Sequence, residues 1–177
     1  MNLHVNHELA LRLAADNVPT FPAQPDGPCM KAPCVSGGFH SATTAPPKIA
    51  ALWSRYPGAL VGIPTGPSTG VWVLDVDGDV GRESLNQILA DLGFETPFDL
   101  TPVISRTPSG GLHLFFRLRP GERPRTRAGD IAPGLDTRGV KADGSDGGCV
   151  IAPGTVLPDG RRYELIEPGS LIAEGWS

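Results

Sequence analysis

Two carboxylates spaced two residues apart, Asp75 and Asp77, are the residues of this chain whose type and spacing most suggest chemistry. They end a short run of Val, Trp and Leu bounded by Gly70 and Gly78, a pattern that predicts a buried strand. Because side chains alternate along a strand, both carboxylates share one face. Neighbouring carboxylates repel each other unless a cation lies between them, and ligand sets made only of oxygen suit Mg²⁺ or Mn²⁺. The alternative interpretation is that both residues are turn and helix-cap residues.

A histidine on a second predicted strand can join this pair. Residues 102–107 and 112–118 flank a Ser-Gly-Gly turn and predict a β-hairpin. If the leucines of the second run face the core, His113 lies on the same face of the sheet as Asp75 and Asp77. A histidine in a strand is more often a half-exposed structural residue. The shared face is the observation that favours a functional role for His113.

The charge is unevenly distributed along the chain. The formal net charge of −4 argues against a protein that coats nucleic acid. Residues 71–101 nevertheless hold seven acidic side chains and one basic one, whereas residues 105–141 hold eight basic and three acidic side chains. An acidic region beside a basic one is what a site for metal and phosphate requires, although ordinary solvated faces produce the same pattern.

The remaining pattern predicts the elements that position these residues. We expect helices over residues 5–17, over the segment that follows a cap at Thr44, and over about 81–92 with Gly93 as the stop. Residues 19–47 are rich in Pro, Gly and Ser and predict a loop with at most one short strand. Further strands are expected at 60–63 and 147–152, with a closing hairpin over 155–166. The basic segment 119–134 is predicted to be a mobile loop.

The cysteines do not predict a metal site or a disulfide framework. Three is an odd number, and the spacing of Cys29, Cys34 and His40 fits no common zinc site. We therefore expect free thiols and no structural zinc. The sequence also lacks a long apolar run and the pattern of a signal peptide, so we expect a cytoplasmic protein without a membrane partner.

The motifs, taken in order, resemble those of a known family. The first half of the pattern consists of Gly-Gly-Phe at 37–39, Ala-Thr at 42–43, Gly62, Thr-Gly at 65–66 and Leu-Asp-Val-Asp at 74–77. The second half consists of Ser-Gly-Gly-Leu-His-Leu-Phe-Phe at 109–116, Leu-Asp-Thr-Arg-Gly at 135–139 and Gly-Gly-Cys-Val-Ile-Ala-Pro at 147–153. Over residues 8–167 the chain resembles the bifunctional primase/polymerase (prim-pol) domain of the archaeo-eukaryotic primase superfamily. Residues 140–146 form a longer insertion after the third motif than the usual linker.

The resemblance implies an α+β protein with the archaeo-eukaryotic primase fold. Its catalytic sheet would be RRM-like and mostly antiparallel, with an N-terminal α/β unit beside it. Residues 1–177 would form one catalytic domain, divided into an N-terminal helical and loop unit (1–58), the catalytic sheet (59–167) and a tail (168–177).

The resemblance also implies roles for particular residues. Asp75, Asp77 and Asp136 would hold two Mg²⁺ or Mn²⁺ ions, and His113, counted with these acids as catalytic, would hold the phosphates of the incoming nucleotide together with Ser109. To these we add Arg106 and Arg138 as nucleotide-binding candidates, because a planar and permanently charged guanidinium suits phosphate oxygens. Crowding three carboxylates without metal predicts that at least one of them has a raised pKa.

The implied activity is that of a DNA primase, a DNA polymerase or both, in plasmid-type or phage-type replication. The expected partners are a single-stranded DNA template, a dNTP or NTP, and a replicative helicase in the same or a neighbouring chain. One alternative is a haloacid-dehalogenase-like phosphatase with Asp75 as nucleophile and Asp77 as acid/base. That family has Thr where this chain has Asp79, and it uses a doubly wound sheet, whereas antiparallel hairpins are predicted here. The other alternative is a non-catalytic module that binds single strands, for which three clustered carboxylates offer no advantage.

Overall fold

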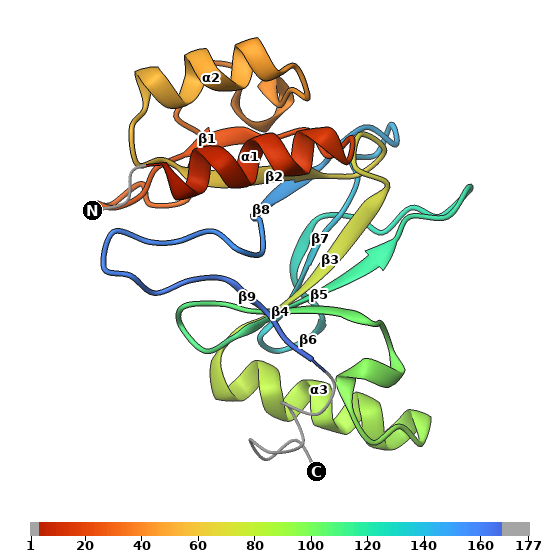
Figure 1. The fold of residues 1–177 in the computed structure, drawn as a ribbon. Coiled ribbons are helices and arrows are strands. Elements are labelled where there is room, and N and C mark those ends of the chain that lie inside the picture. The colour runs from red at the N-terminus through yellow and green to blue at the C-terminus, as the bar shows by residue number, and fades with distance from the viewer. Residues whose placement is uncertain (1–3, 168–177) are drawn as a thin grey trace.

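Two antiparallel sheets organise residues 4–167, the part of the chain that this computed structural model describes (Figure 1). Within these residues the α-helices are α1 (Val5–Ala15), α2 (Pro46–Arg55) and α3 (Gly78–Leu92), and the 3-10 helices are η1 (Gly38–Ser41) and η2 (Pro97–Asp99). Figure 1 shows α1 and α2 beside the smaller sheet, and α3 at the opposite end of the molecule beside the larger one. The mixed α+β class and the mostly antiparallel sheets confirm the predicted fold class.

The larger sheet carries the predicted acidic strand near its centre. Its six strands run in the order β6-β7-β3-β5-β4-β9. Their bounds are β3 (Val71–Val76), β4 (Val103–Arg106), β5 (Leu112–Arg117), β6 (Arg127–Ala132), β7 (Leu135–Arg138) and β9 (Glu164–Leu165). Both neighbours of β3 are antiparallel to it. This pairing contradicts the doubly wound parallel sheet that a haloacid-dehalogenase-like phosphatase would require.

The smaller sheet consists of β1 (Phe21–Ala23), β2 (Leu60–Thr65) and β8 (Gly148–Ile151) in the order β1-β2-β8. We expected β2 and β8 to belong to the catalytic sheet, within residues 59–167, and here the structure differs. Strand β2 cannot pair with the larger sheet because β1 and β8 already occupy both of its edges, and all of its residues are buried. Gly62 allows this packing, since a Cβ at that position would collide with the ring of Phe21.

Both faces of β3 are covered over part of its length. On one face Val73 joins the core that α1 and α2 form over the smaller sheet, together with Phe115 of the neighbouring strand. On the other face Leu74 and Val76 pack against Leu85 and other residues of α3. On the first face the core ends at Val73. The next side chain on that face, Asp75, therefore lies outside the core and between the two sheets.

Several boundaries differ from those predicted. Helix α3 begins at Gly78, three residues earlier than expected, and ends at Gly93, which has the left-handed conformation predicted for a C-terminal stop (φ 71°). The N-cap of α2 is Ala45 instead of Thr44. The basic segment is not all loop, because β6 pairs with β7 although its side chains are almost all exposed. Backbone pairing without burial leaves no alternating hydrophobic pattern, which is why the sequence did not indicate this strand.

The closing hairpin forms as far as Tyr163. Leu157 donates to the carbonyl of Arg161 near the turn, and Tyr163 donates to the carbonyl of Thr155 further along. After Tyr163 the chain leaves the hairpin, and Glu164 and Leu165 pair with β4 as strand β9. The predicted tail, residues 168–177, lies outside the described residues. None of the helices within residues 4–167 has the length and apolar character needed to cross a membrane.

Candidate active site between the two sheets

Three candidate residues form a row across the larger sheet. Asp75 on β3 lies opposite His113 on β5 and opposite Asp136 on β7. Directly opposed residues of antiparallel strands share a face, so the three side chains project from one side of the sheet. The prediction that His113 lies on the carboxylate face is confirmed. The register also brings in Asp136, whose distance from Asp75 along the chain is large.

Asp77 lies at the end of the same strand and in the N-cap position of α3. Its backbone N–H donates to the carbonyl of Gly134 (2.9 Å), and its carbonyl accepts from the N–H of Gly81 (3.0 Å). Its side chain makes no capping hydrogen bond. Asp77 therefore occupies the position of a helix cap, as the alternative interpretation predicted. Its carboxylate, however, does not make the hydrogen bond of a cap residue.

Arg138 lies between two of the carboxylates. Its Nη2 is 2.9 Å from Oδ2 of Asp136 and 3.6 Å from Oδ2 of Asp75. The other oxygen of Asp136, Oδ1, accepts a hydrogen bond from the backbone N–H of Gly129 (2.9 Å). The guanidinium thus supplies, in this structure, part of the positive charge that the predicted cation would supply.

One ring nitrogen of His113 has a partner in the protein, and the other has none among the described residues. Its Nε2 is 3.3 Å from Oδ1 of Asp75, and its ring centroid lies 5.7 Å from that of Tyr163. The imidazole is 6% exposed, and its Nδ1 is buried without a hydrogen-bond partner among the described residues. Buried polar atoms are normally paired, so an orphaned Nδ1 beside a cavity indicates a place for a ligand.

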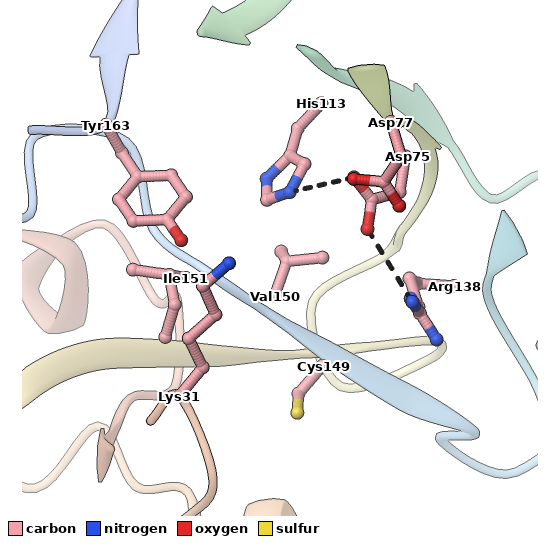
Figure 2. Close-up of a pocket in the computed structure, with 9 residues that line it drawn as sticks. All are labelled: Lys31, Asp75, Asp77, His113, Arg138, Cys149, Val150, Ile151 and Tyr163. Carbon is pink, nitrogen blue, oxygen red and sulfur yellow. Dashed lines mark ion pairs between the residues drawn. The ribbon is translucent and has the colours of Figure 1, made fainter. Parts of the chain in front are cut away.

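All of these side chains except that of Asp136 line a cavity of about 300 Å³ between the two sheets (Figure 2). Asp75, Asp77 and Arg138 line one side of it. Figure 2 shows Lys31 and Tyr163 on the opposite side, facing the carboxylates. Lys31, Tyr163 and Cys149 were not among the predicted site residues. Lys31 lies in an irregular Pro-rich loop and Tyr163 follows a turn, so no periodic pattern pointed to either.

Two other predicted residues lie away from this cavity. Ser109 is exposed in the turn between β4 and β5, where its Oγ lies 3.0 Å from Oγ1 of Thr107. Arg106 is paired with Leu112, one residue out of phase with His113, so its side chain leaves the sheet on the opposite face. Neither residue lines the cavity as the structure describes it.

The surroundings of the site shift the pKa values of Asp75 and Asp77 in opposite directions. Burial is the largest influence on Asp75 and raises its pKa, but the hydrogen bond and charge of His113, together with the charges of Arg138 and Lys31, outweigh burial and leave the pKa below its usual value. Asp77 behaves oppositely, because burial and then repulsion from Asp75 and Asp136 raise its pKa. The expected raised pKa is therefore found, and it belongs to Asp77.

Two neutral groups complete the lining. Burial, followed by the negative charge of Asp75, raises the pKa of Tyr163 far above its usual value, so its hydroxyl keeps its proton at any working pH. Burial also raises the pKa of Cys149, which therefore remains a thiol. Neither group adds negative charge to a cavity that already holds two carboxylates.

A primase-like α+β protein is the class that this fold defines, with an acidic row on an antiparallel sheet and a smaller α/β unit beside it. The family profile of the bifunctional DNA primase/polymerase N-terminal domain (Prim-Pol) matches residues 10–175. The chain belongs to this family, whose members are enzymes of the nucleotidyltransferase type. A search of curated proteins finds no match.

The donor chemistry of the site fits divalent cations. Asp75, Asp77 and Asp136 offer only carboxylate oxygens. Asp75 and Asp136 lie directly opposite each other on neighbouring strands, and Asp77 follows two residues after Asp75 in the N-cap position of α3. In the described part of the chain, no three side chains of His, Cys, Asp or Glu are arranged closely enough to hold an ion. Because Arg138 takes the position between Asp75 and Asp136, metal binding would require its guanidinium to move from them.

A stability measurement tests this charge balance. A carboxyl with a raised folded pKa lowers the free energy of unfolding as pH rises through its unfolded and then its folded pKa, and the loss persists at pH 7. A carboxyl with a lowered folded pKa stabilises the fold above its unfolded pKa, and that contribution is lost as pH falls through the folded pKa. Without metal at pH 7, Asp77→Asn is therefore expected to raise the melting temperature, whereas Asp75→Asn is expected to lower it.

Metal should reverse the penalty at Asp77. At about ten times its dissociation constant, an ion that binds only the folded protein contributes about 1.4 kcal/mol. For a chain of this size the wild-type melting temperature should rise by about 3–6 °C with Mn²⁺, and Asp77→Asn should lose most of that rise. Thermal melts in chelator and in Mn²⁺ measure both effects. If Asp77→Asn melts below wild type in chelator and keeps the full metal shift, Asp77 is only a helix-cap residue.

The absence of structural zinc remains a prediction. Cys29 and Cys34 are free thiols, and Nε2 of His40 lies 2.9 Å from Nζ of Lys141. A histidine nitrogen that faces a lysine in this way is not arranged as a zinc ligand. Elemental analysis of the purified protein is expected to find no stoichiometric zinc. One zinc per chain that disappears in Cys29→Ser would contradict this expectation.

Proposed function

We propose that this chain performs template-directed nucleotidyl transfer, as a DNA primase, a DNA polymerase or both, in replication of the plasmid or phage type. The observation that carries the proposal is the row of Asp136, Asp75 and His113 across the sheet of a prim-pol family member, with Asp77 just after strand β3. Acidic side chains gathered at one side of a cavity whose other side is basic suit a reaction between a hydroxyl and a polyphosphate.

Asp75, Asp77 and Asp136 would hold the Mg²⁺ or Mn²⁺ ions. When bound, such ions stabilise the attacking 3′-oxygen and the departing pyrophosphate as negative charge shifts between them. The 3′-oxygen of the growing strand forms a bond to the α-phosphorus of the nucleotide. The bond from that phosphorus to the bridging oxygen breaks, the electron pair leaves with pyrophosphate, and the hydroxyl proton passes to water.

His113 would position the phosphates. In its doubly protonated form the ring donates from Nε2 to Asp75, 3.3 Å away, and from the unpaired Nδ1 to a phosphate oxygen in the cavity. Asp75 thereby fixes the orientation of the imidazole. Arg138, once displaced from the carboxylates, has a guanidinium of the right shape for a second phosphate contact.

The template would be bound through its backbone by the basic segment. Arg123, Arg125 and Arg127 are exposed beside the catalytic sheet, on the segment that leads into β6. Backbone contacts of this kind carry little sequence preference and weaken as salt rises. Single-stranded DNA, a dNTP or NTP, and a replicative helicase in the same or a neighbouring chain are the partners that this function requires.

A primer-synthesis assay on single-stranded DNA tests the proposal. The protein is incubated with ribonucleotides or deoxyribonucleotides and with Mg²⁺ or Mn²⁺, and products are separated by gel while released pyrophosphate is measured. We expect template-dependent products and an equal amount of pyrophosphate with at least one nucleotide set, with and without an annealed primer. Single-strand binding without any product under all these conditions would indicate the non-catalytic module instead.

A further inference from the structure

The side of the cavity opposite the carboxylates has no role in the site described above. It is formed by Lys31, from the loop after β1, and by Tyr163, which precedes β9. Figure 2 shows the tyrosine hydroxyl and the lysine ammonium on the same side of the cavity and pointing into it, with Asp75 and Arg138 on the far side. The two residues thus form a second polar wall, made by two segments that are distant in sequence.

Tyr163 carries a hydroxyl that the protein leaves unsatisfied. Its side chain is completely buried, and its Oη has no hydrogen-bond partner among the described residues. The ring packs in the core of the smaller sheet with Phe21, Leu60 and Leu157, so it cannot turn outward to reach water. A buried hydroxyl fixed at a cavity wall without a partner indicates a ligand atom that accepts its hydrogen bond.

Lys31 is held at this wall by an unusual backbone conformation. Its φ of 72° is one that residues other than Gly, Asn and Asp rarely adopt. Its N–H donates to the carbonyl of Gln24 (2.9 Å), which fixes the turn, and its Nζ lies 6.0 Å from the centre of the Tyr163 ring. Within residues 4–167 Lys31 has no ion-pair partner, and its ammonium lines the same cavity as the carboxylates of Asp75 and Asp77.

We propose that Lys31 and Tyr163 form the subsite for the terminal phosphates of the incoming nucleoside triphosphate, the part that leaves as pyrophosphate. The inference rests on the proposed function. With the α-phosphate beside the carboxylates and His113, the rest of the triphosphate extends across the cavity toward this wall. A lysine ammonium is a compact charge that suits phosphate, and it would stabilise the negative charge that gathers on the leaving pyrophosphate.

The floor of the cavity supports this assignment. Val150 and Ile151 of β8 lie between the two polar walls, and their side chains offer no hydrogen bond to a base edge or to a sugar hydroxyl. Charged groups are therefore confined to the two ends of the cavity. A triphosphate that spans the cavity places anionic oxygens at both ends, beside the carboxylates with their expected cations and beside Lys31, whereas a base carries no charge for either end.

Direct binding of inorganic pyrophosphate in the presence of Mg²⁺, measured by calorimetry, tests the subsite without turnover. Lys31→Gln is expected to weaken pyrophosphate binding about tenfold, and Tyr163→Phe, which keeps the packed ring, about threefold. In primer extension the same factors should appear in the KM for nucleotide, with the Kd for single-stranded DNA changed less than about twofold. Lys48→Gln, which removes an exposed lysine on α2, is the matched control and should change none of these values.

The outcomes separate this inference from the proposed function. If wild type fails to extend a primer but binds pyrophosphate through Lys31, the proposed function is wrong and the subsite stands. If wild type extends a primer while Lys31→Gln binds pyrophosphate as tightly as wild type, the subsite is wrong and the function stands. Weaker binding of single-stranded DNA with unchanged pyrophosphate binding would assign Lys31 to the template path and would also overturn the proposal.

Discussion

Asp75→Asn is expected to reduce nucleotide incorporation by about a thousandfold or more, to the background of a primer-extension assay. Asparagine has the size of aspartate but lacks the charge that bound cations require. The position is also central, because Asp75 lies between His113 and Asp136 on neighbouring strands and contacts both His113 and Arg138. One substitution therefore removes a proposed cation ligand and the partner of the imidazole.

The matched control is Asp79→Asn. Asp79 is exposed in the first turn of α3, two residues beyond Asp77, and does not line the cavity. This variant should keep its activity within about twofold of wild type. Because Asp75→Asn also removes a partner of two charged side chains, its fold has to be checked by circular dichroism and by a cooperative melt. Full activity in a folded Asp75→Asn protein would remove the basis of the proposed function.

The sequence predicted those parts of the site that follow from strand periodicity. The run before Asp75 and the leucine stripe around His113 fixed which side chains share a face, and the observed register agrees. Asp136 could be proposed only from the family resemblance, because β7 is four residues long, which is too short for its alternation to predict a strand from the sequence. Its position opposite Asp75 depends on strand pairing, which the local sequence does not determine.

What the sequence could not predict depends on tertiary contacts. Strand β2 lies within residues 59–167, the range predicted for the catalytic sheet, yet it belongs to the smaller sheet, where β1 and β8 occupy its two edges. Lys31 reaches the cavity from the loop after β1, and Tyr163 reaches it from the closing hairpin, where its N–H donates to the carbonyl of Thr155. Arg106 shows the converse, since a suitable side chain one residue out of phase points away from the site.

His113→Ala is the substitution with the second largest expected effect. The ring is buried between Asp75 and Tyr163, and its Nδ1 faces the cavity without a partner. A hydrogen bond to a charged phosphate contributes about 1.5–3 kcal/mol, which corresponds to a rise in the apparent KM for nucleotide of about ten- to a hundredfold. The Kd for single-stranded DNA should change less than about twofold, because the template contacts that we propose lie on the basic segment.

Two further variants distinguish phosphate binding from a merely structural role of His113. His113→Asn places an amide near the position of Nδ1 and should recover part of the lost nucleotide affinity, whereas a packing defect would not be repaired by a smaller polar side chain. His40→Ala removes an exposed histidine that contacts Lys141 and does not line the cavity, so its KM should equal that of wild type. Steady-state primer extension at varied nucleotide concentration, together with DNA binding by fluorescence anisotropy, measures all three variants. If His113→Ala loses affinity for DNA while its dependence on nucleotide is unchanged, the imidazole contacts the template, and Nδ1 is satisfied by the nucleic-acid backbone instead of by the incoming nucleotide.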